Sequence, residues 1–385
     1  MDKTAKFYLS SLPFFSLISI VLSTFRSTGQ GGFNEIFLLA LALLDLIVIY
    51  KGRKYLLNYA VLTIFLMSFF TFIIGLINFE LSRRFITDFT NPVFFFAKIY
   101  IFKEYWSRND LSSYLKYYTR FAFIGSIVLL PFVYFMFAST GSTRLAIFPP
   151  MELPFSNYLI SGNNIFLLFS FVIIFLYGKR AILVGAFLTL LTYIIFVNRK
   201  NLLKYILFLV FFIVIMIQVF TIFSDNLAVK RITYTFELFS GKDDNKLNKI
   251  SAGRSDEVDA IIKLMDPIDY VIGKGAGFKY YMMNKGELEE ATNAHFSPLG
   301  FLSKYGIIFT LFIYVFLYRI LFRQNIKHLD NKNFLIALCT SIFIFIESFF
   351  AYTTFVAPIY PVLLGAVLYY KSNKELPKKL ETHEI

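Results

Sequence analysis

Long apolar runs separated by short polar connections make up most of the chain. Several runs approach or exceed the roughly 20 residues that a helix needs to cross a lipid bilayer. None alternates apolar and polar residues with the period typical of transmembrane barrel strands. The pattern therefore predicts membrane-spanning helices. The runs occupy residues 7–25, 33–50, 55–77, 91–104, 121–138, 157–177, 181–197, 202–223, 299–322, 333–352 and 355–370.

One long polar segment, residues 224–297, interrupts this pattern. It separates an N-terminal membrane bundle, residues 1–223, from C-terminal membrane helices at 298–370 and a tail at 371–385. We expect an all-α polytopic membrane protein with about ten to twelve transmembrane helices. The weakest of the expected spans is the short run at 91–104, which contains a lysine.

Composition and charge agree with a membrane protein. Of 385 residues, 57% are hydrophobic and 16% charged, and the single Cys339 excludes a disulfide framework or cysteine metal cluster. The net charge of +13 comes largely from short basic connections such as 51–55 and the tail at 371–379. This bias is typical of cytoplasmic loops, so we expect no nucleic-acid partner. The charges of the long segment roughly balance, which favours the extracytoplasmic side.

The topology contains a conflict. The basic stretch at 318–332 and the basic tail indicate that the long segment lies outside. An inside N-terminus followed by the upstream runs, each crossing once, would instead bring the chain to this segment on the inside. Basic residues flank one run on both sides, at 178–181 and 197–201. Either one of these ends faces outward or one span is miscounted, and we follow the downstream evidence.

Within the long segment, residues 253–267 predict a short amphipathic helix. Val258, Ile261, Ile262 and Met265 recur at the spacing of one helical face. Such a helix could lie on the membrane surface or cover a cavity between spans.

Three glycines and a histidine follow this helix. Gly273, Gly275 and Gly277 allow close approach of the backbone to a ligand or to the helices below. His295 precedes the next apolar run, so we expect it at the membrane–water boundary, where an imidazole can exchange a proton near neutral pH. The alternative is an interfacial histidine that satisfies a helix end.

The order of these motifs resembles the O-antigen polymerase and O-antigen ligase superfamily of membrane glycosyltransferases. The resemblance covers roughly residues 190–310. Its matching positions are Gly253, Arg254, Pro267, Gly273, Gly275, Gly277, His295, Leu299, Leu302, Tyr305 and Gly306.

The chain also departs from the family pattern. The family commonly has Asn after the histidine, where this chain has Phe296, so Asn293 or Ser297 becomes the expected orienting partner. Arg199 lacks the small neighbours of the family's earlier arginine.

The resemblance implies metal-independent, inverting glycosyl transfer from an undecaprenyl-pyrophosphate-linked oligosaccharide at the outer face of the bacterial cytoplasmic membrane. It makes His295 the general base and gives Arg254 and Arg199 to the pyrophosphate, because guanidinium groups suit phosphate oxygens. No cofactor is implied. One candidate to line a cavity between the spans is Glu347, since ionisable residues in spans suggest function. Further candidates are Asn293, Gly275 and Gly277. Arg83, Arg84 and Arg144 are weaker phosphate candidates, better explained as solvated side chains.

Three functions remain open. A polymerase of surface-polysaccharide repeats is favoured, a ligase that moves the finished glycan to lipid A–core is the second, and a lipid or sugar transporter is the third. The absence of a visible internal duplication in the sequence argues against the transporter. Beyond the lipid-linked glycan and membrane lipid, a chain-length regulator is left open as a partner.

Overall fold

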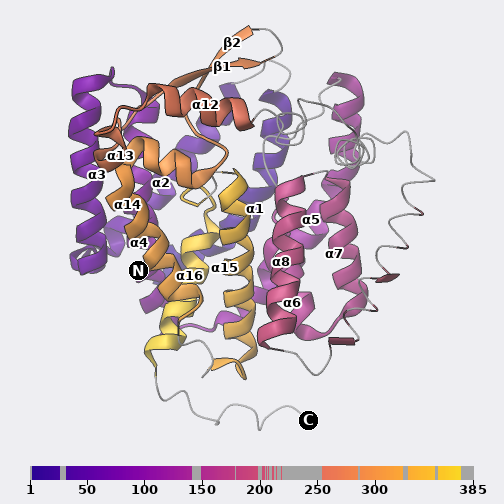
Figure 1. Cartoon of the computed structure of the whole chain (residues 1–385). Helices are drawn as coiled ribbons and strands as arrows, with labels where there is room; N and C mark the ends of the chain where they lie inside the picture. Colours follow the sequence, from indigo (N-terminus) through magenta and orange to yellow (C-terminus); the bar gives the residue numbers. More distant parts are fainter. Residues whose placement is uncertain are drawn as a thin grey trace.

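The computed structural model describes residues 2–26, 32–140, 149–177, 179–197, 254–284, 287–323, 328–351 and 354–373, with scattered residues between 202 and 218. These residues are mostly helical (Figure 1). The helices are α1 (Asp2–Arg26), α2 (Gly32–Lys51), η1 (Arg53–Leu57), α3 (Tyr59–Asn78), α4 (Arg83–Trp106), α5 (Leu111–Thr140), α6 (Glu152–Ser161), α7 (Asn164–Leu176), α8 (Arg180–Phe196), α12 (Arg254–Leu264), α13 (Asp269–Ile272), α14 (Ser297–Leu321), α15 (Lys332–Ala351) and α16 (Ile359–Ser372). The strands are β1 (Tyr280–Asn284) and β2 (Glu287–Ala291).

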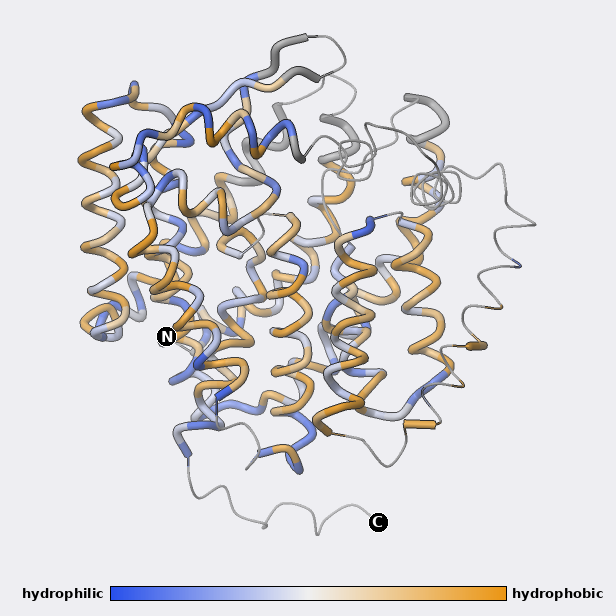
Figure 2. The backbone as a smooth tube through the Cα atoms, viewed as in Figure 1, coloured by the Kyte–Doolittle hydropathy of each residue, from blue (hydrophilic) through white to orange (hydrophobic). Residues whose placement is uncertain are grey.

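Five of the described helices, α1, α3, α5, α14 and α15, are long and apolar enough to cross a membrane. This confirms the expected class, a helical multi-pass membrane protein. Apolar residues fill the middle of the helices, and polar residues gather toward their ends (Figure 2). α3 illustrates the outer surface, because it exposes a row of large apolar side chains that suits contact with lipid. The sequence predicted an all-α protein, but the structure also contains the antiparallel strand pair β1–β2.

The bundle has two chemically different ends. We call the end that carries α12, α13 and the β1–β2 hairpin the loop end (Figure 1). At the other end the Lys371 ammonium donates hydrogen bonds to the carbonyls of Arg319 and Ile320, which joins the ends of α16 and α14. We call this the basic end. The cations described at this end include Lys51, Arg53, Lys54, Lys103, Arg108, Lys116, Arg120, Arg319, Arg323, Lys332 and Lys371.

The short run at 91–104 belongs to a longer helix than expected. α4 has 24 residues and begins eight positions earlier, where the Ser82 side chain caps the amide of Phe85. Its Lys98 is buried and forms an ion pair with Asp45 of α2 at 2.8 Å. The lysine that weakened the prediction is therefore neutralised by a neighbouring helix.

The expected single span at 157–177 is wrong, because the chain turns back within it. α6 ends at Ser161 and is capped by Gly162, which has the left-handed φ of 71° that favours glycine, and α7 begins at Asn164. α7 runs parallel to α5, since Phe123 contacts Phe166 while the Tyr134 hydroxyl donates to the carbonyl of Leu176. The chain thus reverses direction once more than the sequence suggested.

This extra reversal changes which end of the bundle the basic residues around α8 reach. α8 runs antiparallel to α15, because Lys179 interacts with Glu347 while Gly185 packs against Phe343. The basic residues before α8 therefore lie toward the loop end and α8 ends toward the basic end.

Candidate functional site

The imidazole of His295 is held by a buried carboxylate on α12. Nδ1 of His295 lies 3.1 Å from Oε1 of Glu257, and the His295 backbone amide donates to Oε2 at 3.0 Å. The Tyr280 hydroxyl donates to the same carboxylate. The Glu257 side chain is 2% exposed, whereas the His295 side chain is 60% exposed. A carboxylate at Nδ1 favours the tautomer that leaves Nε2 free to accept a proton.

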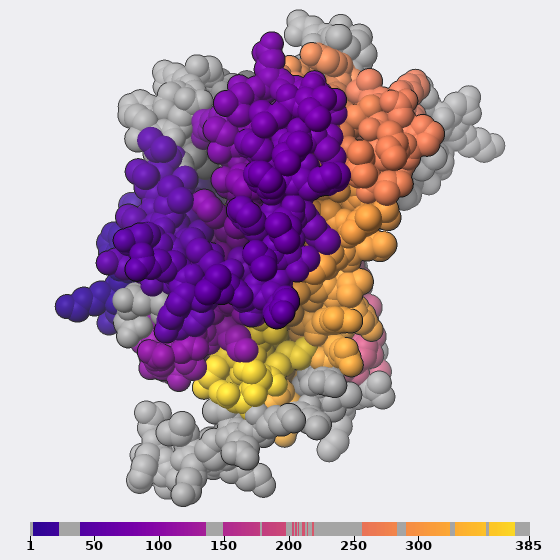
Figure 3. Space-filling model, turned by 90° about the vertical axis from the view of Figure 1, so that its left-hand side faces the viewer, coloured from indigo at the N-terminus to yellow at the C-terminus, as the bar shows by residue number. Residues whose placement is uncertain are grey.

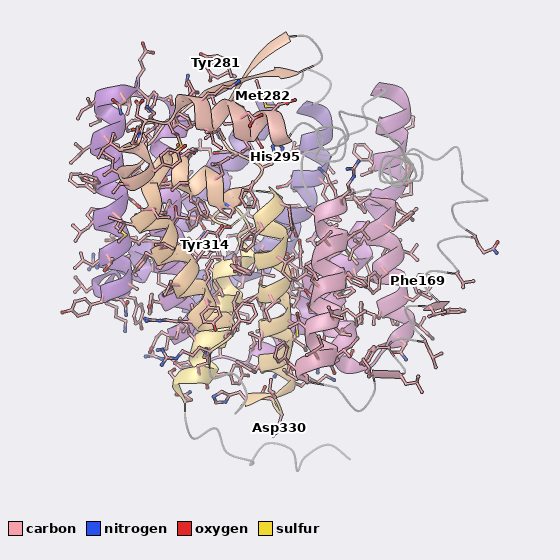
Figure 4. All side chains as sticks on the ribbon, in the orientation of Figure 1. Phe169, Tyr281, Met282, His295, Tyr314 and Asp330 are labelled. Atoms are coloured by element: carbon pink, nitrogen blue, oxygen red, sulfur yellow. The ribbon has the colours of Figure 1, made fainter. Side chains whose placement is uncertain are left out.

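Glu257 reaches this position because α12 packs with one face inward. Ile261 and Met265 are buried on that face against Phe278 and Leu299. The predicted helix thus corresponds to α12, but Ile262, assigned to its apolar face, is 45% exposed. α12 covers the start of α14, and Figure 4 shows His295 below it at the loop end.

Competing effects act on the carboxyl group of Glu257. Burial would raise its pKa, but hydrogen bonds from His295 and Tyr280 more than offset this and lower the pKa below the ordinary value. Burial and the neighbouring Glu257 charge raise the pKa of Tyr280. Glu257 is therefore ionised and Tyr280 protonated at neutral pH, so the carboxylate can stabilise a protonated imidazole.

The glycine-rich turn packs directly on two helices, one of the two alternatives that the sequence leaves open. α14 is broken at Gly306, where φ is 79°. The backbone amides of Lys274 and Gly275 donate to the carbonyls of Ser303 and Lys304, just before this break, at 2.8 and 3.0 Å. A Cβ on Gly306 would lie 2.1 Å from the carbonyl oxygen of Val271, so the close approach requires glycine here.

The same turn also contacts α3. The Ala276 amide donates to the carbonyl of Thr71, and Gly75 leaves room for the turn. Figure 3 shows α3, in purple, beside the orange segment that contains the turn and α14. The segment that carries His295 is thus anchored on both sides.

A second buried carboxylate fixes this segment to the bundle. Oδ1 of Asp88, on α4, lies 2.7 Å from Nζ of Lys304, and Lys304 donates to the Asn293 amide oxygen at 2.7 Å. The other carboxylate oxygen accepts the amide of Gly277 at 3.0 Å. The Tyr305 hydroxyl donates to the carbonyl of Asp88 at 2.6 Å. The Lys304 side chain is 1% exposed and that of Asp88 9%, so this ion pair is closed to solvent, while Asn293 lies at its exposed edge.

The structure brings some of the predicted residues together and separates others. His295, Asn293, Gly275 and Gly277 lie in one connected region at the loop end. The expected orienting partners are wrong, because Asn293 binds Lys304 and the Ser297 hydroxyl donates to the carbonyl of Ser348.

The candidate phosphate ligands have different outcomes. Arg254 is the first residue of α12, one turn before Glu257, but its side chain lies outside the described part. Arg199 and Arg144 lie outside the described residues altogether. Arg83 and Arg84 begin α4 at the loop end, where the half-exposed Arg84 side chain lies 3.8 Å from Glu290 of β2.

Glu347 makes no described contact with the histidine. It is buried in α15 at 3% exposure and interacts with Glu152 of α6. The described contacts do not join it to His295 or Glu257.

Sequence reasoning missed Glu257, Tyr280, Asp88 and Lys304. Glu257 resembled an ordinary acidic residue in the first turn of a helix, where carboxylates stabilise the helix dipole. Asp88 and Lys304 carried a usable signal, because each is a charged residue inside or beside an apolar helical run.

Comparison with protein-family models, curated proteins and solved structures finds no match to this chain. The functional argument therefore depends on the residues of the site.

Proposed function

We propose that the chain is a membrane glycosyltransferase that polymerises lipid-linked glycan repeats, with His295 as the general base. The observation that carries this proposal is the pairing of an exposed imidazole with the buried carboxylate of Glu257. A base oriented by a carboxylate on its far nitrogen is a recurring arrangement for activating a hydroxyl group.

The reaction requires one proton transfer and one displacement. Nε2 of His295 accepts the proton of an acceptor sugar hydroxyl, and the hydroxyl oxygen forms a bond to the anomeric carbon of the donor. The bond between that carbon and the pyrophosphate oxygen breaks, so the configuration inverts. Glu257 stabilises the resulting imidazolium, which later returns its proton to water.

The departing pyrophosphate needs positive charge near His295. α12 begins with Arg254 one turn before Glu257, and its N-terminus adds the positive end of a helix dipole. Arg84 is a further cation at the same end. We propose Arg254 as the main pyrophosphate ligand and Arg84 as an auxiliary one, while Arg199 keeps its role from the family resemblance.

Orientation follows from the cations of the basic end. By the positive-inside rule these residues face the cytoplasm, which puts the loop end, with His295, on the outer face. In this proposal the membrane is the bacterial cytoplasmic membrane, where an undecaprenyl-pyrophosphate-linked glycan would reach the site.

The two alternatives predict different behaviour. A ligase would use the same donor chemistry and pass the glycan to lipid A–core instead of to another repeat. A transporter is favoured by one observation, the break in α14 at Gly306, since broken helices often bind substrates in transporters. However, the carbonyls of Ser303 and Lys304 beside this break already accept amides from the glycine turn.

The test uses purified protein, an undecaprenyl-pyrophosphate-linked repeat unit and gel analysis of the glycan products. We expect His295→Ala to lower polymerisation by about 10²–10⁴-fold, the usual contribution of a general base. His328→Ala is the matched control, because His328 lies before α15 at the basic end. His328→Ala should keep the wild-type melting temperature, whereas His295→Ala should melt at a lower temperature but remain folded, because it removes one hydrogen bond from the buried Glu257 carboxylate. Wild-type polymerisation by folded His295→Ala would exclude the proposed mechanism.

The acceptor assay separates the alternatives. Supplying lipid A–core with preformed polymer distinguishes a ligase, which would attach the polymer, from a polymerase, which would leave it unattached. Translocation of the lipid-linked repeat across proteoliposomes without any new glycosidic bond would indicate a transporter.

A further inference from the structure

A cavity of about 730 Å³ opens at the basic end, opposite His295. The first turns of α5, the turn between α6 and α7, and the start of α15 form its walls. Its volume lies in the range of ligand-binding pockets. It is too far from the loop end to serve the glycosyl transfer proposed above, and the inference below does not depend on that function.

The charged side chains that line the cavity are all cationic. They are Lys116 and Arg120 of α5 and Lys332 of α15, and the described lining contains no carboxylate. Lys116 and Arg120 are one helical turn apart, a spacing at which two like charges destabilise a helix. A bound anion would remove this repulsion.

The nearest acid does not neutralise the cavity. Lys116 interacts electrostatically with Asp110, which lies outside the lining. The Asp110 carboxylate accepts the backbone amides of Ser112 and Ser113 at 3.0 and 2.9 Å, so it caps the start of α5.

Three helices begin at the wall of this cavity. α5 starts at Leu111, α7 at Asn164 and α15 at Lys332. α7 and α15 direct the positive ends of their dipoles toward this region, which adds to the charge of the three cations, whereas Asp110 already caps the start of α5. Amide and hydroxyl groups, including those of Asn157 and Ser161, supply further hydrogen-bonding partners.

One wall of the cavity is apolar and continues to the outside of the bundle. Phe123 is buried, whereas Ile124 of α5 and Phe166 of α7 are 60% and 42% exposed. Both exposed residues belong to apolar helices whose outer surfaces suit contact with lipid. A ligand with a phosphate group and a hydrocarbon chain matches both walls, because its charge would meet the cations and its chain would follow Ile124 and Phe166.

We propose that this cavity binds the phosphate of an anionic membrane lipid through Lys116, Arg120 and Lys332. Basic pockets between transmembrane helices on the cytoplasmic side bind lipid headgroups in this manner. The same phosphate chemistry could come from a soluble compound, and the apolar wall favours the lipid.

Native mass spectrometry of the full chain in detergent, titrated with palmitoyl-oleoyl phosphatidylglycerol, tests the proposal. We expect one tightly retained lipid and weaker retention of phosphatidylcholine. The triple variant Lys116→Gln/Arg120→Gln/Lys332→Gln should bind phosphatidylglycerol roughly 100-fold more weakly, about fivefold for each cation removed.

The matched control is Lys51→Gln/Arg53→Gln/Lys54→Gln, which removes the same charge from exposed residues of the basic end outside the cavity. This control should bind like the wild type. Equal loss in both triple variants would overturn the proposal, because it would indicate only general surface attraction. Melting temperatures in phosphatidylcholine confirm that both variants fold.

Two further arms identify the source of the phosphate. Ile124→Ser/Phe166→Ser should weaken binding of phosphatidylglycerol by about an order of magnitude, because it removes apolar contact with the chain. Glycerol 3-phosphate should compete weakly. If glycerol 3-phosphate instead displaced the lipid at equal concentration, a soluble phosphate compound would be the ligand and the lipid assignment would be wrong.

Discussion

The loop end contains two buried carboxylates whose partner side chains differ in their exposure to solvent. Glu257 binds His295, whose side chain is 60% exposed, while Asp88 binds Lys304, whose side chain is 1% exposed. Both carboxylates also accept a backbone amide of the long segment. The first pair can therefore reach a substrate, whereas the second can only hold the segment in place.

This difference gives the two pairs different roles within one region: the Glu257 pair can take part in a reaction, and the Asp88 pair stabilises the structure. A buried ion pair contributes little net stability when intact, but removing one partner leaves an uncompensated charge. An exposed base oriented by a buried carboxylate instead offers a free nitrogen to a reactant. Variants of the two carboxylate pairs should therefore affect different measurements.

The largest expected effect is on stability, and it comes from breaking the buried ion pair of Asp88 and Lys304. Lys304→Met leaves Asp88 buried without its cation, so we expect the free energy of unfolding to fall by about 3–5 kcal/mol. Denaturant unfolding in detergent micelles measures this. Lys304→Met/Asp88→Asn should recover part of the loss, because it removes the buried charge and keeps an acceptor for Gly277. An unchanged stability of Lys304→Met would show that Asp88 is not a scaffold residue.

The next effect is on activity, from Glu257→Gln. We expect glycan polymerisation to fall at least about tenfold, within the range of a misoriented general base. Removing the negative charge also withdraws the stabilisation of the imidazolium that forms during proton transfer, so kcat should fall while KM stays nearly unchanged. A purely structural role of Glu257 would instead lower the melting temperature together with the activity.

The pH dependence of the free energy of unfolding gives a further test of the role of Glu257. Hydrogen bonds lower the pKa of Glu257 in spite of its burial, so its carboxylate stabilises the fold above the ordinary value of about 4.3. That contribution is lost as pH falls through the lowered pKa. The wild type should therefore lose more stability than Glu257→Gln between about pH 5 and 3. Parallel stability curves would contradict the lowered pKa.

The sequence predicted the parts of this region that depend on local pattern. The periodicity of Ile261 and Met265 was sufficient for α12, and the glycine spacing was sufficient for a close turn. The partner of His295 was not predictable, because Glu257 lies 38 positions away and meets it only through tertiary packing. Choosing Asn293 or Ser297 for their closeness in the chain gave the wrong partner.

The two larger misses have similar causes. Asp88 and Lys304 are 216 positions apart, so each looked like an isolated charge in an apolar run. The hairpin of α6 and α7 was hidden because both helices are apolar, although Gly162 and the Asn163 cap mark the turn. The pattern of apolar and polar residues was sufficient to predict the helices. Which charged residues form ion pairs became visible only from the packing of those helices.

The smallest expected effect distinguishes Arg84 from both pairs. Its side chain is half exposed and lies 3.8 Å from Glu290, and such surface ion pairs contribute at most about 1 kcal/mol. Arg84→Gln should therefore leave the melting temperature nearly unchanged. If Arg84 assists pyrophosphate binding, KM for the lipid-linked donor should rise about fivefold at constant kcat, the loss of roughly one weak charge interaction. Lys263→Gln, an exposed charge on α12, is the control. Equal KM values for both variants would remove Arg84 from the site and leave the leaving group to Arg254.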